Sequence, residues 1–140
     1  MAAMTEEARE AFLARPRIGV LSTLAEDGAP LAIPIWFEWD GQRVLMFTSE
    51  TSPKMRRLRN DSRATLLVAA EVGEQEEWVA MDGQVAIHSD GAIELAARLA
   101  ERYWDLNDPE HAATLQLWRD QASTLRRLEI IPSRIRSHTG

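Results

Sequence analysis

Two Asp-Gly pairs, Asp27-Gly28 and Asp40-Gly41, separate three short apolar segments near the start of the chain. Such pairs are typical of tight hairpin turns, because glycine accepts the positive φ that these turns need. The flanking segments, residues 17–24, 31–39 and 43–48, are dominated by aliphatic and aromatic side chains. We therefore predict three antiparallel strands in a meander, which argues against a doubly wound parallel sheet.

The rest of the chain alternates between helical and strand patterns. A capping residue followed by proline, as in Ser52-Pro53, is typical of a helix start, and Gly83 within an apolar run is a plausible bend. About six strands with small helices between them favour a small, mostly antiparallel barrel. The predicted helices cover residues 6–15, 53–60, 92–104 and 110–121, and the further strands cover residues 64–72, 78–88 and 125–132, followed by an irregular tail.

Length and composition fit a single domain over residues 1–140, with 45% hydrophobic residues to form a core. No apolar run approaches the ~20 residues that span a bilayer, so we expect no membrane insertion. The first fifteen residues are polar and lack the features of a signal peptide, and the chain has no cysteine. Both observations suit the cytoplasm. The net charge of −6 argues against general nucleic-acid binding, which needs a basic surface.

The segment 48–59, TSETSPKMRRLR, places hydroxyl side chains directly before a basic helix. Lys54 is the only lysine in the chain. The hydroxyls of Thr48, Ser49 and Ser52, the free N–H groups of the helix start and the Lys54 ammonium are the donors that a phosphate requires. The residues alone leave two interpretations open: an anion site, or an ordinary helix start followed by a solvated basic face.

The arginines that follow Lys54 admit two interpretations as well. Arg56, Arg57, Arg59 and Arg63 reverse the local charge of an acidic protein and could steer an anionic ligand. They could equally pair with the acidic loop at residues 71–77, in the same subunit or in another.

The predicted strand at 31–39 is apolar on both faces and is interrupted by Pro34. Proline cannot donate a ladder hydrogen bond, so this strand belongs at an edge or a bulge. A flat ligand could lie against the opened backbone, or the strand could simply pack in the core and in a dimer interface.

The sequence contains no set of side chains typical of a protein-borne catalytic centre. It has no nucleophile elbow and no glycine-rich phosphate loop. Its histidines, His88, His111 and His138, lack metal-ligand spacing, so we predict no metal site. If the protein is an enzyme, we expect a bound cofactor to carry the reaction.

The order of these motifs resembles the FMN-binding split-barrel superfamily, the pyridoxamine 5'-phosphate oxidase-like proteins. The resemblance rests on the meander, the Phe-Thr-Ser-x-x-Ser-Pro-Lys segment at 47–54, the basic helix, the apolar strand and the Trp-Val-x-x-x-Gly-x-Val segment at 78–85. It covers nearly the whole chain. It implies a mainly β fold with helices (α+β), namely an antiparallel six-stranded split β-barrel with small flanking helices.

The resemblance also implies site residues. Lys54 matches the family's phosphate lysine, with Thr48, Ser49 and Ser52 beside it. Residues Ile33, Pro34, Ile35 and Trp36 match the strand whose backbone meets the isoalloxazine ring. Trp78 matches a side chain near the cofactor that often comes from the second subunit, and the acceptor pocket is expected around Trp36, Trp78, Tyr103 and Trp104.

The implied function is an FMN- or F420-dependent oxidoreductase that transfers hydride or electrons to a small organic acceptor, with the cofactor at a homodimer interface. The compact phosphate segment favours FMN. The chain departs from true pyridoxamine phosphate oxidases, since Pro53 replaces the arginine before the phosphate lysine and the C-terminal substrate-phosphate motif is missing. Vitamin B6 oxidation is therefore not predicted. The alternatives are a non-catalytic flavin- or haem-binding protein for storage or sensing, and a barrel that has lost its cofactor.

Overall fold

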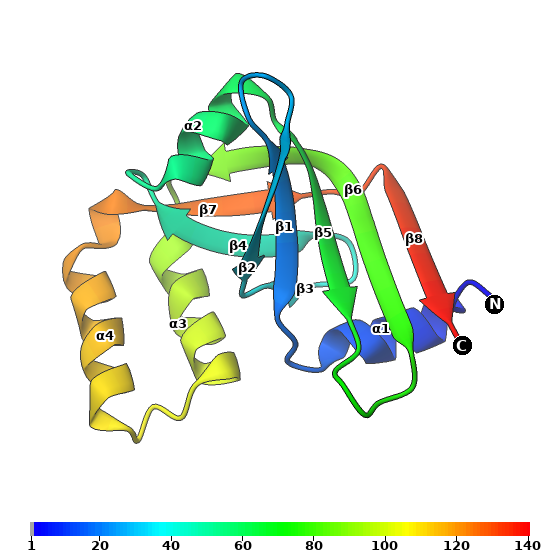
Figure 1. Ribbon diagram of the computed structural model, residues 1–140. Helices are drawn as coiled ribbons and strands as arrows, with labels where there is room; N and C mark the ends of the chain where they lie inside the picture. Colours follow the sequence, from blue (N-terminus) through cyan, green and yellow to red (C-terminus); the bar gives the residue numbers. More distant parts are fainter. Residues whose placement is uncertain (1) are drawn as a thin grey trace.

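The computed structural model describes residues 2–140 as a curved antiparallel sheet with helices at its margins (Figure 1). The strands are β1 (Gly19–Leu24), β2 (Pro30–Ile35), β3 (Glu38–Trp39), β4 (Val44–Ser49), β5 (Arg63–Ala69), β6 (Glu77–His88), β7 (Leu125–Ile130) and β8 (Arg134–Thr139). The helices are α1 (Glu6–Ala14), α2 (Pro53–Asn60), α3 (Ala92–Tyr103) and α4 (Pro109–Asp120), with a short 3₁₀ turn at Ala122–Thr124.

The strands lie in the order β2-β1-β5-β6-β7-β4-β3, and β8 pairs with the first half of β6. The long strand β6 belongs to two layers: its first residues pair with β5 and β8, and Val85–His88 pair with β7. In Figure 1 β4 and β7 cross behind β1 and β5. Every pairing is antiparallel, so the sheet forms the split barrel that was predicted.

Gly83 lies where β6 changes layers. A Cβ atom at this position would lie 2.9 Å from the Ile130 side chain and 3.1 Å from the Ile131 carbonyl oxygen. Only glycine allows the backbones of β6 and the end of β7 to approach this closely. The predicted bend at this position is therefore confirmed as the point where the barrel folds over.

Both predicted Asp-Gly hairpin turns are present. Gly28 and Gly41 have φ values of 87° and 94°. The Asp40 carboxylate accepts hydrogen bonds from the backbone N–H groups of Gln42 and Arg43, which stabilises the second turn.

The strand predicted over residues 31–39 is instead two strands. β2 ends at Ile35, the chain crosses between layers through Trp36 and Phe37, and β3 begins at Glu38. Phe37 is fully buried, and its backbone N–H donates to the Tyr103 hydroxyl at 3.3 Å rather than to a neighbouring strand. The apolar character on both faces reflects this crossing.

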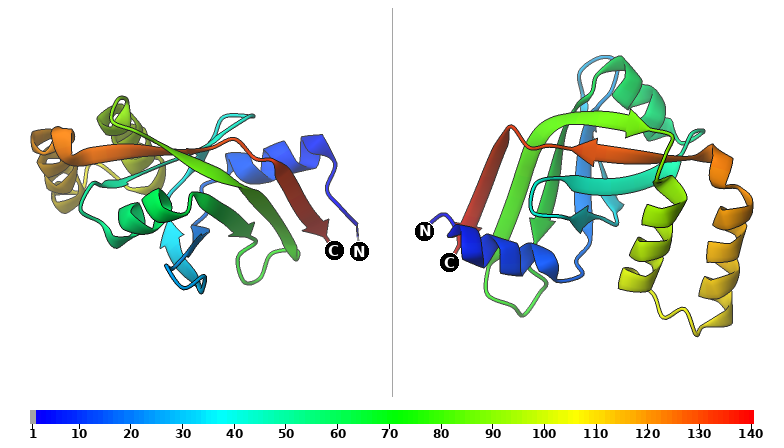
Figure 2. Two further views of the ribbon diagram at one scale, coloured as in Figure 1. Left: turned by 90° about the horizontal axis from the view of Figure 1, so that it is seen from above. Right: turned by 180° about the vertical axis from the view of Figure 1, so that it is seen from behind.

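The expected irregular tail is also wrong, because residues 134–139 form β8 along β6. The barrel therefore has eight strands rather than six, the additional ones being β3 and β8. The two ends of the chain lie close together there (Figure 2). Ala2 and Thr139 exchange backbone hydrogen bonds.

The main hydrophobic core fills the space between the two layers. Its largest buried side chains come from both layers and from α1 and α2, and they include Leu13, Leu21, Phe37, Met46, Met55, Leu58, Leu66, Met81, Leu128 and Ile130. A second apolar contact holds α3 against β4, through Leu95 and Leu99 on α3 and Leu45 on β4. The helical spacing of these α3 residues explains why one face of the helix is buried.

The helices α3 and α4 form a pair beside the barrel (Figures 1 and 2). α4 begins after Asp108, whose carboxylate accepts from the Glu110 backbone N–H, with Pro109 at the first helical position. No helix within residues 2–140 combines the length and the apolarity needed to cross a membrane.

Candidate cofactor-binding site

The predicted phosphate segment lies between the end of β4 and the start of α2. α2 buries Met55 and Leu58, which fixes the direction of its remaining side chains. Lys54 and Arg57 are three residues apart and therefore share one face of the helix. Both are partly buried, whereas Arg56 on the same helix is exposed.

Hydroxyl groups hold the Lys54 ammonium in place. Lys54 Nζ donates to Thr48 Oγ1 at 3.0 Å, and Thr48 Oγ1 donates to Ser52 Oγ at 2.9 Å. An ammonium group carries three N–H donors, so two remain for a ligand. The hydroxyl of Ser52 accepts from Thr48 and keeps its own hydrogen free.

Ser52 is the N-cap residue of α2, but its side chain makes no capping hydrogen bond. The hydroxyl bonds to Thr48 instead, so the interpretation of an ordinary capped helix start does not describe this position. The Ser49 hydroxyl, in contrast, lies 3.1 Å from the hydroxyl of Thr51 within the same loop. Ser52 and Lys54 therefore share one hydroxyl network with Thr48, and Ser49 lies in another.

Three cations of α2 have no carboxylate partner within residues 2–140: Lys54, Arg56 and Arg57. Arg57 Nε donates to the hydroxyl of Thr23 on β1 at 2.9 Å. Burial lowers the pKa of Lys54, and the nearby positive charge of Arg57 lowers it further. A bound anion would offset both the lost hydration of the Lys54 ammonium and its repulsion by Arg57. A basic face open to solvent would have neither cost.

The other cations considered with Lys54 are neutralised locally. Arg59 forms a bidentate contact with Glu50, and Arg63 pairs with Asp61. The acidic loop does not meet these arginines in this chain, because Glu74 pairs with Arg15 and Arg17.

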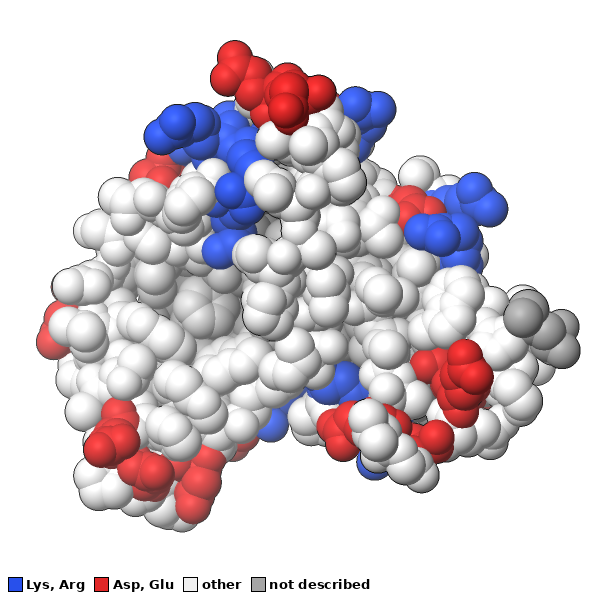
Figure 3. All heavy atoms as spheres, in the orientation of Figure 1, with Lys and Arg blue, Asp and Glu red and all other residues white. Residues whose placement is uncertain are grey.

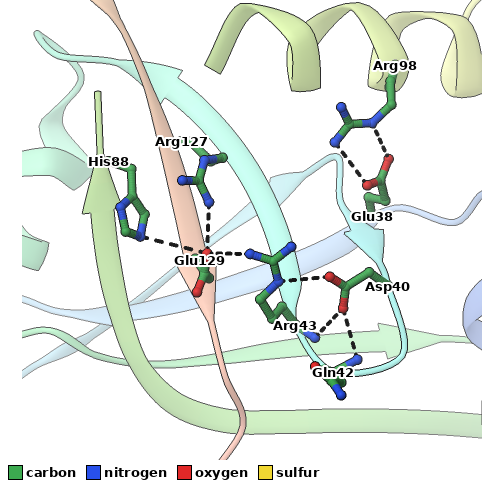
Figure 4. Close-up of polar contacts among 8 residues, drawn as sticks. All are labelled: Glu38, Asp40, Gln42, Arg43, His88, Arg98, Arg127 and Glu129. Atoms are coloured by element: carbon green, nitrogen blue, oxygen red, sulfur yellow. Dashed lines mark hydrogen bonds and ion pairs between the residues drawn. The ribbon is translucent and has the colours of Figure 1, made fainter. Parts of the chain in front are cut away.

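A similar neutralisation occurs around Glu129 on β7 (Figure 4). Glu129 accepts hydrogen bonds from Arg43 at 3.0 Å and from Arg127 at 2.8 Å, and His88 Nε2 lies 3.7 Å away. Arg43 also bonds to Asp40. The charges of Arg43 and Arg127 are neutralised by Glu129 and Asp40, whereas His88 Nε2 is buried without a hydrogen-bond partner.

An aromatic cleft lies between the helical pair and β2. It has a volume of about 370 Å³ and is lined by Ile18, Pro34, Ile35, Trp36, Phe47, Trp104 and Trp118, none of them charged. In Figure 3 a hollow between these elements has Lys and Arg side chains along its upper rim and uncharged side chains on its walls. The volume falls within the range of small-molecule sites, roughly 300–1,000 Å³.

The indole rings of the aromatic cleft pack against one another. Trp36 stacks on Tyr103 with 5.1 Å between ring centroids, and it meets Trp104 edge-on at 4.6 Å. Trp118 stacks on Trp104 at 5.5 Å and contacts Phe47 at 5.2 Å. Such pairs prefer fixed geometries, so the wall of the cleft is preorganised.

The predicted ring-contacting residues divide between this cleft and the core. Pro34, Ile35 and Trp36 line the cleft, whereas Ile33 packs against the main core. β2 is an edge strand, where a proline costs no ladder hydrogen bond.

Trp78 lies apart from these residues within one chain. It is the second residue of β6, opposite Ala69 and His138, and its ring stacks on His138 at 6.2 Å between centroids. It does not line the aromatic cleft.

The sequence indicated Arg57 as a possible anion contact but missed Thr23, Phe47 and Trp118 as residues of this region. Thr23 and Arg57 approach one another only because α2 packs on β1, and Phe47 and Trp118 meet only because α4 packs beside β4. No local pattern signals such contacts. Within the described part of the chain, no group of three His, Asp or Glu side chains is placed to hold a metal ion.

Structures similar to this chain share the split-barrel fold. They include a protein described as an F420 reductase (TM-score 0.74, 22% identity, 90% of this chain and 94% of that chain covered). A conserved hypothetical protein from Mycobacterium tuberculosis has a TM-score of 0.75 and 24% identity, covering 97% of this chain and 85% of its own. An FAD-binding protein from Mesorhizobium loti has a TM-score of 0.66 and 15% identity, covering 97% and 93%.

The sequence itself gives the family. The sequence model of the protein family described as pyridoxamine 5'-phosphate oxidase matches residues 4–129, nearly the whole chain. The matched region includes the hydroxyl network, Lys54 and the aromatic cleft. The chain therefore belongs to the pyridoxamine 5'-phosphate oxidase family.

Proposed function

We propose that this protein is an oxidoreductase that binds FMN, or alternatively F420, and transfers hydride or electrons to a small organic acceptor. The observation that carries the proposal is the partly buried Lys54 ammonium. It has no carboxylate partner within residues 2–140, it is held by Thr48, and its pKa is lowered by burial and by Arg57. A cofactor phosphate supplies the missing negative charge.

Each residue of the phosphate segment has a distinct role in this proposal. Lys54 and Ser52 donate to the phosphate, and the N–H groups at the start of α2 add their partial positive charge. Thr48 is buried and already bonded to both, so it orients them without touching the ligand. Arg57, held by Thr23, adds a second positive charge beside Lys54.

The cofactor ring is proposed to lie at the edge of β2, against Pro34, Ile35 and Trp36. The bound cofactor supplies the redox chemistry, because the chain shows no catalytic set of its own. The uncharged walls of the aromatic cleft exclude water from the ring and strengthen local electrostatic interactions. The outer edge of β2 has backbone groups free to meet the ring or a second subunit.

We propose a homodimer with the cofactor at its interface. Ile18, Leu31 and Leu67, on or next to β1, β2 and β5, are 51%, 40% and 38% exposed in the single chain. Covering these side chains favours association. Trp78 is remote from Lys54 along the fold, so a second copy is the proposed source of its contact with the cofactor.

The compact phosphate segment favours FMN over F420. Of the arginines that could meet the acidic tail of F420, Arg59 is already neutralised by Glu50. Arg56 and Arg57 remain available. Vitamin B6 oxidation is not proposed, because Pro53 occupies the position at which true pyridoxamine phosphate oxidases carry arginine.

The test is a titration of the purified, cofactor-free protein with FMN and with F420, followed by reduction assays with several acceptors. We expect one cofactor to bind and its reduced form to be reoxidised by an organic acceptor. Tight binding without turnover of any acceptor would favour storage or sensing, and haem binding in place of both cofactors would favour the haem alternative. Binding of none of the three would contradict the proposal.

A further inference from the structure

We propose that the helix side of the aromatic cleft, formed by Trp104 and Trp118, is a binding site for planar, uncharged aromatic acceptors that carry a hydrogen-bond acceptor at their edge. This inference rests on the proposed function, since it assigns the acceptor a place beside the cofactor ring. It divides the cleft into two parts, with the cofactor at β2 and the acceptor at the helical pair.

The shape of the wall selects planar molecules. Trp104 stacks on His111 with 5° between the ring planes and on Trp118 with 20° between the ring planes. Trp118 is held edge-on against Phe47. Both indole rings also line the cleft, so part of each stays open to a ligand. A flat ring contacts these open parts more fully than a puckered ring of the same volume.

The charge of the wall selects uncharged molecules. The aromatic cleft has no charged residue in its lining, so an ionised ligand would lose hydration there without gaining a partner. The charges of Lys54 and Arg57 belong to the proposed phosphate position. Anionic ligands would therefore compete for that position rather than for the helix side.

The polar groups of the wall select an acceptor atom. Trp39 donates its indole N–H to Glu10. The indole N–H groups of Trp36, Trp104 and Trp118 have no such partner within residues 2–140, and they are not among the buried polar atoms. They are accessible donors, and a carbonyl or nitro oxygen at the edge of a flat ligand can accept from them.

The size of the wall limits the ligand. About 370 Å³ is near the lower end of small-molecule sites, roughly 300–1,000 Å³. One or two fused rings fit this space once a cofactor ring covers the β2 side. Long-chain or multi-ring molecules would have to extend into solvent.

Trp36 contacts Trp104 and Trp118 edge-on, but its position also has support outside these two residues. Its ring stacks on Tyr103, whose hydroxyl donates to the Arg17 carbonyl at 2.6 Å. A substitution at Trp104 or Trp118 therefore removes one edge contact of Trp36 but leaves its stack on Tyr103 in place. This separation allows the two parts of the cleft to be tested one at a time.

The experiment is equilibrium dialysis of acetylnaphthalene against the full chain, first without cofactor and then loaded with whichever of FMN and F420 it binds. We expect acetylnaphthalene to bind in both states, and naphthoate and the fully saturated acetyldecalin to bind more weakly. Trp104→Leu and Trp118→Leu should each weaken acetylnaphthalene binding about 2- to 12-fold, the loss of one aromatic pair. The cofactor Kd should change less than about 2-fold.

Matched variants interpret the result. Trp39→Phe removes a tryptophan outside the cleft and should change neither affinity, whereas Lys54→Ala should weaken the cofactor alone. If a leucine variant fails to fold, Trp118→Phe and Trp104→Phe keep a ring and should still weaken ketone binding by loss of the indole N–H. Circular dichroism establishes that each variant is folded.

Three outcomes would overturn the inference. The tryptophan variants could lose cofactor affinity and acetylnaphthalene affinity equally, or the wild-type chain could bind the three probes with equal affinity. Acetylnaphthalene could also fail to bind once the cofactor is loaded. Failure of the proposed function looks different. In that case neither cofactor binds the wild-type chain, while acetylnaphthalene still binds the cofactor-free protein and responds to the tryptophan variants.

Discussion

Replacement of Lys54 by alanine tests the cofactor site most directly. The substitution removes the ammonium that Thr48 orients, together with the two N–H donors that remain for a phosphate. A hydrogen bond to a charged group contributes about 1.5–3 kcal/mol. At about 1.4 kcal/mol per tenfold change, this corresponds to a cofactor Kd about 12- to 140-fold higher.

The same substitution should leave the fold intact. Burial lowers the pKa of Lys54, which means that folding disfavours its charged form. Removing that charge therefore relieves an unfavourable desolvation, and the midpoint of urea unfolding should stay unchanged or rise slightly in the absence of cofactor. Lys54→Arg keeps the charge but replaces a compact ammonium with a planar fork, so it should weaken cofactor binding as well.

Arg56→Ala is the matched control. It removes the same unit of charge from the same helix, but Arg56 is exposed and forms no hydrogen bond or ion pair within residues 2–140. Fluorescence titration of the cofactor-free protein measures all three variants. A cofactor Kd for Lys54→Ala within twofold of the wild-type value would refute the phosphate assignment. If Lys54→Ala and Arg56→Ala weaken cofactor binding equally, the effect of Lys54 is only that of its charge at long range.

Four further predictions follow from particular contacts. Cofactor affinity should fall at alkaline pH below the usual Lys54 pKa of 10.5, because the lowered pKa removes the charge early; a titration series in which Lys54→Ala shows the same decline would contradict this. Gly83→Ala should destabilise the fold by about 1–3 kcal/mol in urea unfolding, since the added methyl group overpacks the layer change. The Arg136 hydrogen bonds lower the pKa of Asp82 to about 2. The stability that these hydrogen bonds provide is therefore present above the unfolded-state pKa of 3.8 and is lost as the pH falls toward 2. Asp82→Asn should remove this acid sensitivity and should cost about 1–2 kcal/mol of stability at neutral pH. Thermal unfolding across a pH series measures both effects. Tyr103→Phe should cost about 1–2 kcal/mol in chemical denaturation, because its hydroxyl bonds to the backbone that supports Trp36.

The fold was predictable where neighbouring residues decide the structure. The Asp-Gly turns, the proline after Ser52 and the glycine at position 83 each impose a backbone conformation that the structure contains. The strand β8 was missed for the opposite reason. Its sequence, RIRSHT, has little strand character, and it is ordered by pairing with β6 more than forty residues earlier in the chain.

The break within the predicted strand at 31–39 has a related cause. The pattern indicated burial on both sides, whereas most residues of β2 are exposed in the single chain. Full burial is reached only at Phe37, where the segment passes from one layer to the other. Trp36 faces the aromatic cleft and Phe37 enters the core, so the two adjacent residues serve different environments. Periodicity cannot separate a strand buried on both sides from such a crossing, because both give an uninterrupted apolar run.

The candidate site divides in the same way, and the division has a functional consequence. The proposed phosphate end lies within residues 48–57, and a few adjacent residues suffice to bring Thr48, Ser52 and Lys54 into contact. The helix side of the aromatic cleft depends on α3 and α4, which are joined to the barrel mainly through side-chain packing. Changes in those helices can therefore alter which acceptor fits without disturbing the phosphate anchor. Within the proposed function, one barrel can in this way keep a single phosphate anchor while the wall opposite the ring decides the acceptor.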